Sequence, residues 1–457
     1  MYLFKLKYDS KNYRCIVLLI LLTGLQNVYG QQNELKNKWK EKLHFSLITE
    51  MDIAYEFKSH QLQKAEFILK PEVVYKFNNK LKIVGLGRIY TEVLDNLEPG
   101  VPDQVASSTF NKRLFIGDRV EVELRELYLH ARILNKVNIR IGKQQIVWGE
   151  TDGLKLLDVI NPQYFREFIL DDLVDSRIPL WSIKTEFPIK KLKIQLLWIP
   201  DLTYHALIDS DAPYFPKSAL PEPPMGIETI FWPIEKPSNI VLDSDVGLKL
   251  SVLIKGWDIT ANYFYYYDDF PVFYNSLSFQ ASGEPSIMIN PQYERHHLLG
   301  FTFNKPVKLV ILRGEMGYKF YQNFLSTNPE ASRGIVQSDQ FNTAIGLDLI
   351  KGENIASTQL FIDYLIDDVP VFNRNRIEWT VSLLLSREFM NDSFKAEALW
   401  VHSINHKDGL LRPKLSYWLT SNVQLLLSSD IFYGNKSMLF GQFKDRSRAS
   451  VGLIWGI

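Results

Sequence analysis

Apolar and polar residues alternate one by one along most of this chain, in segments that have the length of β-strands. In the clearest case, apolar side chains from Leu43 to Phe57 share one face, and charged side chains such as Glu50 and Asp52 share the other. The side chains of a strand alternate between two faces, whereas a helix would scatter these charges around its circumference. The pattern recurs at 64–77 and up to the last residues, so the sequence predicts a long series of strands.

The connections between these segments alternate between short and long. Short gaps fall at 78–80, 135–136, 189–191, 255–256, 304–306, 351–354, 391–392 and 421–422. Longer gaps separate them, including 95–118, 201–242 and 270–292. Short turns at one end and long loops at the other are typical of a barrel that is threaded through a membrane.

We therefore predict an all-β fold, a transmembrane antiparallel β-barrel formed by residues 43–457, with about 18 strands or, as the alternative, about 16. The soluble alternatives are a β-sandwich and a propeller, whose strands are usually shorter, about 5–6 residues. The apolar faces of those folds point inward. The many charges on the polar faces favour the membrane barrel, because its inner face lines water.

The first 30 residues have the features of a secretory signal peptide. Basic residues precede the apolar run Cys15–Leu22, and Val28–Gly30 resembles a signal peptidase site. We expect cleavage near Gly30, followed by a short periplasmic tail at 31–42. A single anchor helix is the alternative, but the apolar run is shorter than the roughly 20 residues that a spanning helix needs. The predicted location is the outer membrane of a Gram-negative bacterium.

Composition narrows the class of protein further. Aromatic residues make up 13% of the chain, which suits the two interfacial girdles of a membrane barrel. The sole cysteine, Cys15, lies in the predicted signal peptide, which excludes disulfides, cysteine nucleophiles and thiolate metal sites from the rest of the chain. Basic and acidic residues are equal in number, 52 each, and nothing indicates nucleic-acid binding.

The segment at about 149–180 differs from the other long gaps. It lies between two predicted strands and is rich in apolar residues for a solvated loop. Asn161 followed by Pro162 is a favourable helix start, and the apolar residues from Phe165 to Ile169 then share one helical stripe. We predict that this segment contains a short helix and folds into the lumen as a constriction.

Three carboxylates complicate this helix. Asp171, Asp172 and Asp175 would lie near its C-terminus, where the helix dipole disfavours anions. Either the helix stops near Leu170, or cations of the segment and of neighbouring strands hold these carboxylates. Our hypothesis is that such ion pairs fix the constriction. The predicted pore-lining and constriction residues are Arg125, Arg140, Lys143, Glu150, Asp152, Asp158, Arg166, Asp171, Asp172, Asp175 and Arg177. The alternative is a compact cap on the extracellular rim, with these charges in solvent.

The same part of the chain carries a resemblance to known proteins. The stretches 142–153, 157–162, 171–173 and 177–181 resemble a family of Gram-negative outer-membrane proteins that is known only as a domain of unknown function. A more distant likeness is to alginate-export and substrate-specific porin barrels. The resemblance implies an outer-membrane barrel, sometimes linked to export pumps for lipid-like compounds, and it supplies no catalytic residues.

Residue patterns that would indicate an enzyme are missing from the sequence. It has no HExxH and no GxSxG pattern. Glu150, Asp152 and Asp158 do not have the spacing of a calcium-binding loop, and the adjacent His296 and His297 would point to opposite faces of a strand. We expect no enzyme activity, no cofactor and no bound metal.

The sequence therefore favours a channel that passes a polar or amphipathic solute through a lumen of mixed charge with an internal constriction. One alternative is an outer-membrane component of a lipid or polysaccharide export system. Others are a barrel hydrolase and a surface adhesion or assembly protein, for which the proline-rich stretch 201–242 argues. The expected partners are outer-membrane lipid, the barrel assembly machinery and a periplasmic pump or export protein. We expect a monomer that binds no nucleic acid.

Overall fold

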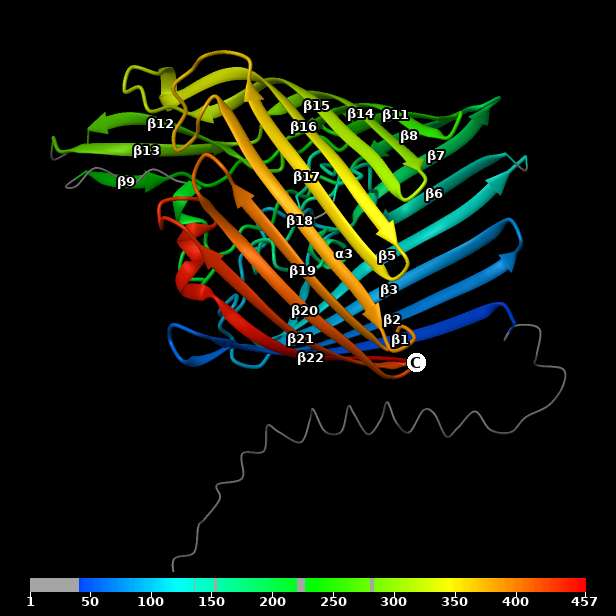
Figure 1. Cartoon of the computed structure of the whole chain (residues 1–457). Coiled ribbons are helices and arrows are strands. Elements are labelled where there is room, and N and C mark those ends of the chain that lie inside the picture. Colours follow the sequence, from blue (N-terminus) through cyan, green and yellow to red (C-terminus); the bar gives the residue numbers. More distant parts are fainter. Residues whose placement is uncertain (1–40, 135, 152–153, 220–226, 280–282) are drawn as a thin grey trace, which may run out of the picture. The chain divides into compact units, whose positions relative to one another are not determined.

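Residues 41–134, 136–151, 154–219, 227–279 and 283–457 are described by the computed structural model (Figure 1). The predicted signal peptide, its cleavage site near Gly30 and most of the predicted tail at 31–42 lie outside these residues. Residues Phe45–Ile457 form one compact unit, which contains the fold described below apart from the first two residues of β1. None of the helices among the described residues is long and apolar enough to cross a membrane.

Within the described part of the chain, 18 strands form one closed antiparallel barrel. They are β1 (Leu43–Glu56), β2 (Gln61–Asn78), β3 (Leu81–Glu92), β5 (Val120–Ile133), β6 (Val137–Gln144), β7 (Leu180–Ile189), β8 (Leu192–Ile199), β10 (Asp245–Ile254), β11 (Trp257–Tyr267), β14 (Arg295–Val307), β15 (Val310–Leu325), β16 (Ile335–Lys351), β17 (Asn354–Leu365), β18 (Ile377–Phe389), β19 (Phe394–Ser403), β20 (Asp408–Thr420), β21 (Val423–Tyr433) and β22 (Arg448–Gly456).

The barrel closes where the last strand meets the first. Each barrel strand pairs with the next barrel strand along the chain, and β22 then pairs with β1, from Ile48 opposite Gly456 to Glu56 opposite Arg448. The prediction of 18 strands is therefore confirmed, and the smaller alternative is wrong.

The two ends of the barrel differ as the sequence predicts. Tight turns join hairpins such as β16–β17 and β20–β21 at one end. At the other end the connections at 93–119, 145–179, 200–244 and 268–294 are long, although 57–60 between β1 and β2 and 404–407 between β19 and β20 are short. Figure 1 shows the long loops at the left of the barrel and the tight turns at the right.

One predicted turn is misplaced. The sequence suggests a break at 304–306, but β14 continues through Pro306 and turns at Lys308 and Leu309. Proline is tolerated there because β11 pairs with β14 only as far as Asn304, so Pro306 has a paired strand on one side alone.

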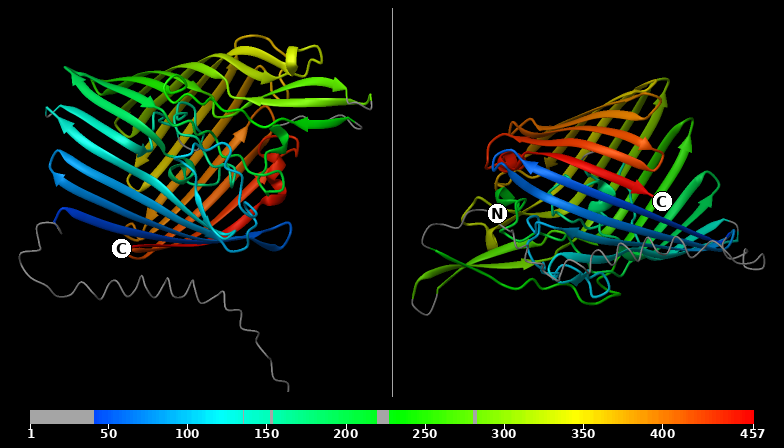
Figure 2. Two further views of the ribbon diagram at one scale, coloured as in Figure 1. Left: turned by 180° about the vertical axis from the view of Figure 1, so that it is seen from behind. Right: turned by 90° about the horizontal axis from the view of Figure 1, so that it is seen from below.

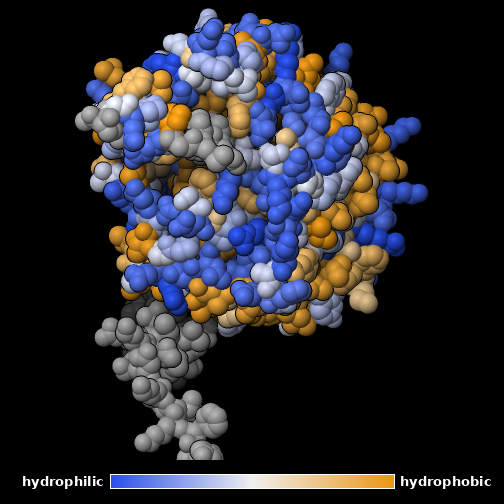
Figure 3. Space-filling model, turned by 90° about the vertical axis from the view of Figure 1, so that its left-hand side faces the viewer, coloured by the Kyte–Doolittle hydropathy of each residue, from blue (hydrophilic) through white to orange (hydrophobic). Residues whose placement is uncertain are grey.

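Side chains alternate between the outer and inner faces of the barrel wall. On β1, Met51 and Ile53 are 44% and 51% exposed, whereas Ala54 and Glu56 are buried. Exposed apolar residues alternate in the same way along β16 and β21. At the long-loop end, hydrophilic residues cover the centre of the face, and hydrophobic residues gather toward its margin (Figure 3). This is the reverse of a soluble sandwich, whose apolar faces point inward.

Long loops enter the barrel from one end (Figure 2). Two clusters of buried apolar side chains form where these loops meet the wall, one that includes Trp148 and Leu157 and one that includes Leu170 and Phe443. The interior is therefore partly filled, and the space that remains is bounded by the loops as well as by the strands.

A small sheet stands at the long-loop end, beside the barrel sheet. It consists of β9 (Glu228–Phe231), β12 (Val272–Phe279) and β13 (Pro285–Gln292), with β12 antiparallel and β9 parallel to β13. Figure 1 shows these strands extending beyond the barrel. The other elements of the described residues are β4 (Leu114–Ile116), α3 (Leu173–Ser176), η2 (Lys217–Ala219), η3 (Ser332–Gly334) and η4 (Gly441–Arg446).

Candidate functional site

The connection between β6 and β7 lies inside the barrel, and we call it the inserted segment. It comprises residues 145–179 without 152–153. One part of it is anchored at β15. The Glu315 carboxylate accepts hydrogen bonds from the backbone N–H groups of Glu150 and Leu157, and Arg313 donates to the Glu150 carbonyl over 2.7 Å. A buried carboxylate that accepts backbone N–H groups is a strong anchor, since its charge is compensated by fixed donors.

Apolar packing surrounds this anchor. Trp148 is 1% exposed, donates its indole N–H to Gln195 of β8 over 2.7 Å, and meets Phe264 of β11 edge-on with ring centroids 5.7 Å apart. Leu157 is fully buried beside Gly300 of β14, where an added Cβ would come within 2.9 Å of the leucine. The wall is therefore shaped to receive the segment.

The far part of the inserted segment is held on the opposite side of the barrel by ion pairs. Glu167 lies between two cations that come from the two ends of the chain, Lys64 of β2 at 2.7 Å and Arg448 of β22. Lys64 also binds Glu66 at 2.9 Å, and Arg448 binds Asp430 of β21 at 2.8 Å. All five side chains belong to one buried network.

Two further contacts fix the same part of the segment to the wall. Lys70 of β2 binds Asp175 at 2.9 Å. Arg412 of β20 donates to the carbonyl of Leu170 over 2.8 Å. The segment thus reaches from β15 to β2, β20 and β22, so the alternative of a cap on the rim is wrong, and the prediction of a segment folded into the barrel is confirmed.

The helix predicted from Asn161 is wrong. Gln163 and Tyr164 form isolated β-bridges with Arg177 and Ala206 instead. The Asn161 side chain does not cap a helix: it accepts from the N–H of Ile146 over 2.7 Å and donates to the carbonyl of Ile178 over 2.8 Å. Asn161 therefore joins the two ends of the segment, a role that its local sequence does not reveal.

The only helix in the described part of the segment is α3, and it starts later than predicted. Asp172 precedes α3 and Asp175 lies in its single turn, so Asp171 and Asp172 do not stand at the C-terminus of a helix. The predicted conflict with the dipole is therefore wrong. The expectation of cation partners holds for Asp175, which binds Lys70.

Arg166 lies in a second buried ion network, on the side of β3 and β5. It binds Glu98 at 3.1 Å and Glu121 at 2.8 Å, and both carboxylates also bind Arg113. The guanidinium of Arg166 lies 4.0 Å from the centroid of the Tyr90 ring. Arg166 is thus a structural cross-link between the segment and the wall.

Other residues that were predicted to line the pore form contacts that stabilise the inserted segment itself. Arg177 binds Asp158 at 2.7 Å, and both are buried. Arg125 of β5 donates to the carbonyls of Val174 and Arg177 over 2.9 and 2.6 Å. Lys155 approaches Asp158 at 3.8 Å, and burial lowers the pKa of Lys155 to about 8. These residues shape the segment more than they line open space.

The remaining predicted residues lie apart from one another. Lys143 of β6 is 2% exposed. Arg140 lines a separate cavity of about 200 Å³ toward the tight-turn end, together with Arg132, Lys184 and Glu186. Asp152 lies outside the described residues.

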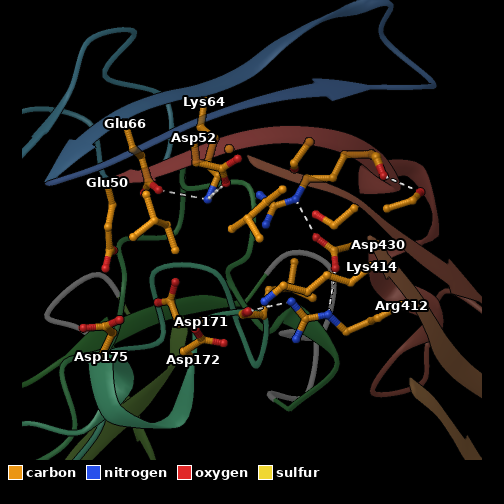
Figure 4. A pocket seen from close by; sticks show the side chains of 18 of the residues that line it. Glu50, Asp52, Lys64, Glu66, Asp171, Asp172, Asp175, Arg412, Lys414 and Asp430 are labelled. Atoms are coloured by element: carbon orange, nitrogen blue, oxygen red, sulfur yellow. Dashed lines mark hydrogen bonds and ion pairs between the residues drawn. The ribbon is translucent and has the colours of Figure 1, made fainter. Parts of the chain in front are cut away.

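The space beside the inserted segment is a cavity of about 310 Å³ (Figure 4). Its lining is charged and comes from three sources: the inserted segment, the strands β1–β3 and the strands β18–β22. The charged lining residues are Glu50, Asp52, Lys64, Glu66, Arg88, Arg166, Asp171, Asp172, Asp175, Glu397, Arg412, Lys414, Asp430 and Arg448. Figure 4 shows the aspartates of the segment with Glu50 on one side and Arg412 with Lys414 on the other.

Three of these charges have no ion-pair partner among the described residues: Asp171 and Asp172 of the segment, and Lys414 of β20. Enclosure by the protein and the neighbouring carboxylates of Glu167 and Glu66 raise the pKa of Asp171 to about 7. The cavity thus presents acids without an ion pair on the segment and a base without one on the facing wall.

The sequence analysis missed the cations that hold the inserted segment. Lys64, Arg412 and Arg448 occupy alternate, inward positions of their strands, which was the available signal. With 18 strands, however, alternation marks many inward charges and does not say which of them meet.

The comparisons with known proteins agree with this architecture. OccAB2 of Acinetobacter baumannii matches with a TM-score of 0.50 at 10% identity, over 91% of this chain and 98% of that one. OccK9 (OpdG) of Pseudomonas aeruginosa matches with a TM-score of 0.49 at 9% identity, over 92% and 98%. A BenF-like porin from Pseudomonas fluorescens Pf-5 matches with a TM-score of 0.48 at 9% identity, over 91% and 98%.

At these identities the likeness concerns the fold. It is a likeness of closed β-barrels, the fold that the sequence analysis predicts. No protein-family model matches the chain, and no curated protein matches it.

Proposed function

We propose that this chain is an outer-membrane channel that passes a small polar or amphipathic solute, and that the inserted segment is its constriction. The observation that carries the proposal is the attachment of this segment to opposite walls of a closed barrel, with a charged cavity of about 310 Å³ left beside it. A closed barrel with an apolar outer face and a charged interior is suited to a bilayer and to aqueous passage.

The charges around the cavity suggest how a solute is selected. Asp171 and Asp172 face the side of Arg412 and Lys414, so a field runs across the passage (Figure 4). A solute that loses its hydration water in this cavity regains hydrogen bonds and ion pairs only if its polar groups match both the acidic and the basic side. We infer that the constriction favours solutes with separated polar groups over purely apolar ones.

The cavity around Arg140 gives the tight-turn end of the lumen a basic lining. Arg132, Arg140 and Lys184 outnumber Glu186 in its lining, so the potential there favours negative groups. A solute that leaves the constriction would then meet a basic region. We propose that the tight-turn end faces the periplasm, as in other membrane barrels.

Most ionised groups of the interior bind each other, which suits a rigid framework for passage better than catalysis. Glu121, for example, is shared by Arg88, Arg113 and Arg166. We therefore propose a channel without enzymatic activity. The export-system, adhesion and hydrolase alternatives, the expected partners and the monomeric state stay predictions.

Electrical recording from a planar bilayer tests the proposal. The full chain is compared with a variant in which residues 150–178 are replaced by a short Gly/Ser linker. We expect small steps of current from the full chain and steps several-fold larger from the variant, because the lumen area grows when the segment is removed.

A control for folding accompanies this test, since the variant loses several buried contacts. Barrels that have folded migrate differently on gels before and after heating, and both proteins must show this shift. Absence of any current from a folded full chain would refute the channel. Equal steps from both folded proteins would refute the constriction.

A further inference from the structure

A third cavity, of about 320 Å³, lies at the long-loop end. It is bounded by the start of β12, the end of β15 and the connection between β17 and β18. Its lining residues are Asp268, Phe270, Pro271, Val272, Phe273, His296, Gln322, Asn323, Phe324, Leu325, Ile335, Val371, Phe372 and Arg374. Its volume falls in the range of small-molecule pockets, about 300–1,000 Å³.

The cavity belongs to the inner side of the barrel wall. His296 of β14 and Gln322 of β15 are 4% and 6% exposed, whereas the adjacent Tyr321 is 62% exposed on the outer face. A backbone hydrogen bond from Phe372 to Leu325 ties the loop between β17 and β18 to the end of β15. The walls therefore come from strands of the barrel and from a connection that is hydrogen-bonded to one of them.

The cavity combines apolar rings with polar groups of both kinds. Four phenylalanines line it: Phe270, Phe273, Phe324 and Phe372. Among the described residues, the Gln322 amide nitrogen and Arg374 Nε are buried donors with no hydrogen-bond partner. Burying such donors is costly, so they indicate a missing acceptor.

The charges around the cavity restrict the chemical class of ligand that it can bind. The Arg374 guanidinium is neutralised by Asp363 at 2.7 Å, whereas Asp268 brings a carboxylate into the lining. A negatively charged aromatic acid would meet Asp268, and Arg374, the only lysine or arginine among the lining residues, is already bound to Asp363. A neutral ring with hydroxyl groups has no such conflict, because each hydroxyl both donates to a carboxylate and accepts from an amide.

We propose that this cavity binds a hexopyranose ring, free or at the end of a short saccharide, before the ring reaches the constriction. The C–H face of the sugar lies against the phenylalanine rings, and its hydroxyls pair with Asp268, Gln322 and Arg374. The inference rests on the proposed function, for which it names the solute class. Phe270 also packs against the inserted segment, since its ring centroid lies 5.5 Å from that of Phe165.

Binding of D-glucose and maltose to the purified full chain in detergent tests this inference by calorimetry, with benzoate and glycine as competing classes. We expect the sugars to bind and benzoate not to bind. Phe324→Ala and Gln322→Leu should each weaken maltose binding by about tenfold, the scale of one lost ring contact or hydrogen bond. Phe279→Ala, at a phenylalanine that is 69% exposed on β12 and outside this cavity, is the matched control and should bind like wild type.

The variant Asp268→Asn distinguishes the binding of a sugar from the binding of a carboxylic acid. The amide oxygen keeps the bond that Asp268 accepts from the Phe270 N–H at 3.1 Å, but the charge is lost. We expect weaker maltose binding and new, weak benzoate binding. Benzoate binding to wild type, or unchanged maltose binding in all three cavity variants, would overturn the inference. A channel that conducts but binds no sugar refutes this inference alone, whereas sugar binding without conductance refutes the proposed function alone.

Discussion

The two attachments of the inserted segment use different physics. At β15 the segment is held by apolar burial of Trp148 and Leu157 and by backbone N–H groups on Glu315. At β2 and β22 it is held by charged side chains, chiefly Glu167 with Lys64 and Arg448. Apolar burial depends little on pH, whereas an ion pair is lost when either of its groups is neutralised. The segment therefore has one permanent and one adjustable attachment.

Removing a cation from the adjustable attachment should have the largest effect. Lys64→Met leaves Glu66 and Glu167 with one cation fewer in a buried site. Breaking a buried pair in this way costs about 3–5 kcal/mol. We expect a lower temperature for the gel shift of the folded barrel and larger, noisier current steps, measured together.

The matched control for this variant is Lys58→Met. Lys58 also forms an ion pair, with Asp445, but its side chain is 69% exposed. We expect its removal to leave both the gel shift and the current unchanged. If the two lysine variants behave alike, the buried network does not hold the segment.

The permanent attachment should respond in another way. Leu157→Ala opens a void beside Gly300 and should cost about 3 kcal/mol, as buried leucine deletions do. Because no charge is involved, the loss measured by the gel-shift temperature should be the same at low and high salt. A strong salt dependence of this loss would show that the two attachments are not separate.

The unpaired charges of the cavity should set selectivity. In the proposed channel, Asp172→Asn should lower the ratio of cation to anion permeability, and Lys414→Gln should raise it, each by roughly fivefold or less, the scale of about 1 kcal/mol for a nearby charge in water. Reversal potentials in a salt gradient measure both. Shifts in the same direction would argue against opposed charges across the passage.

The smallest predicted effect comes from Asp171. Its pKa is raised from 3.8 to about 7, so the folded protein retains the proton in a range where the unfolded chain has lost it. The stability that this proton brings is complete below pH 3.8 and is lost as pH rises through 7. Cation selectivity should accordingly fall by roughly twofold from pH 8 to pH 6, as one charge is lost. Asp171→Asn should abolish this change, and an unaltered profile in that variant would assign the titration to another group.

The barrel was predictable from the sequence because apolar and polar residues alternate in every strand. A register shift of one residue would move the apolar side chains to the inner face. The charged partners were much less predictable. Lys64 and Arg448 both bind Glu167 only because β1 pairs with β22 and closes the barrel. A local sequence pattern does not show that these two distant strands pair. Asn161 misled the sequence analysis for a similar reason, since the same amide that caps a helix also binds strand ends across a loop.

The position of Glu167 has a consequence for the order of assembly. Its two cations stand on either side of β1, at the seam where the beginning and the end of the polypeptide meet. The carboxylate therefore finds both of them only in a finished cylinder. Before β22 pairs with β1, the segment would lack this double ion pair and keep only contacts such as those of Glu315 and Arg166, so its full attachment forms in the same step that closes the barrel.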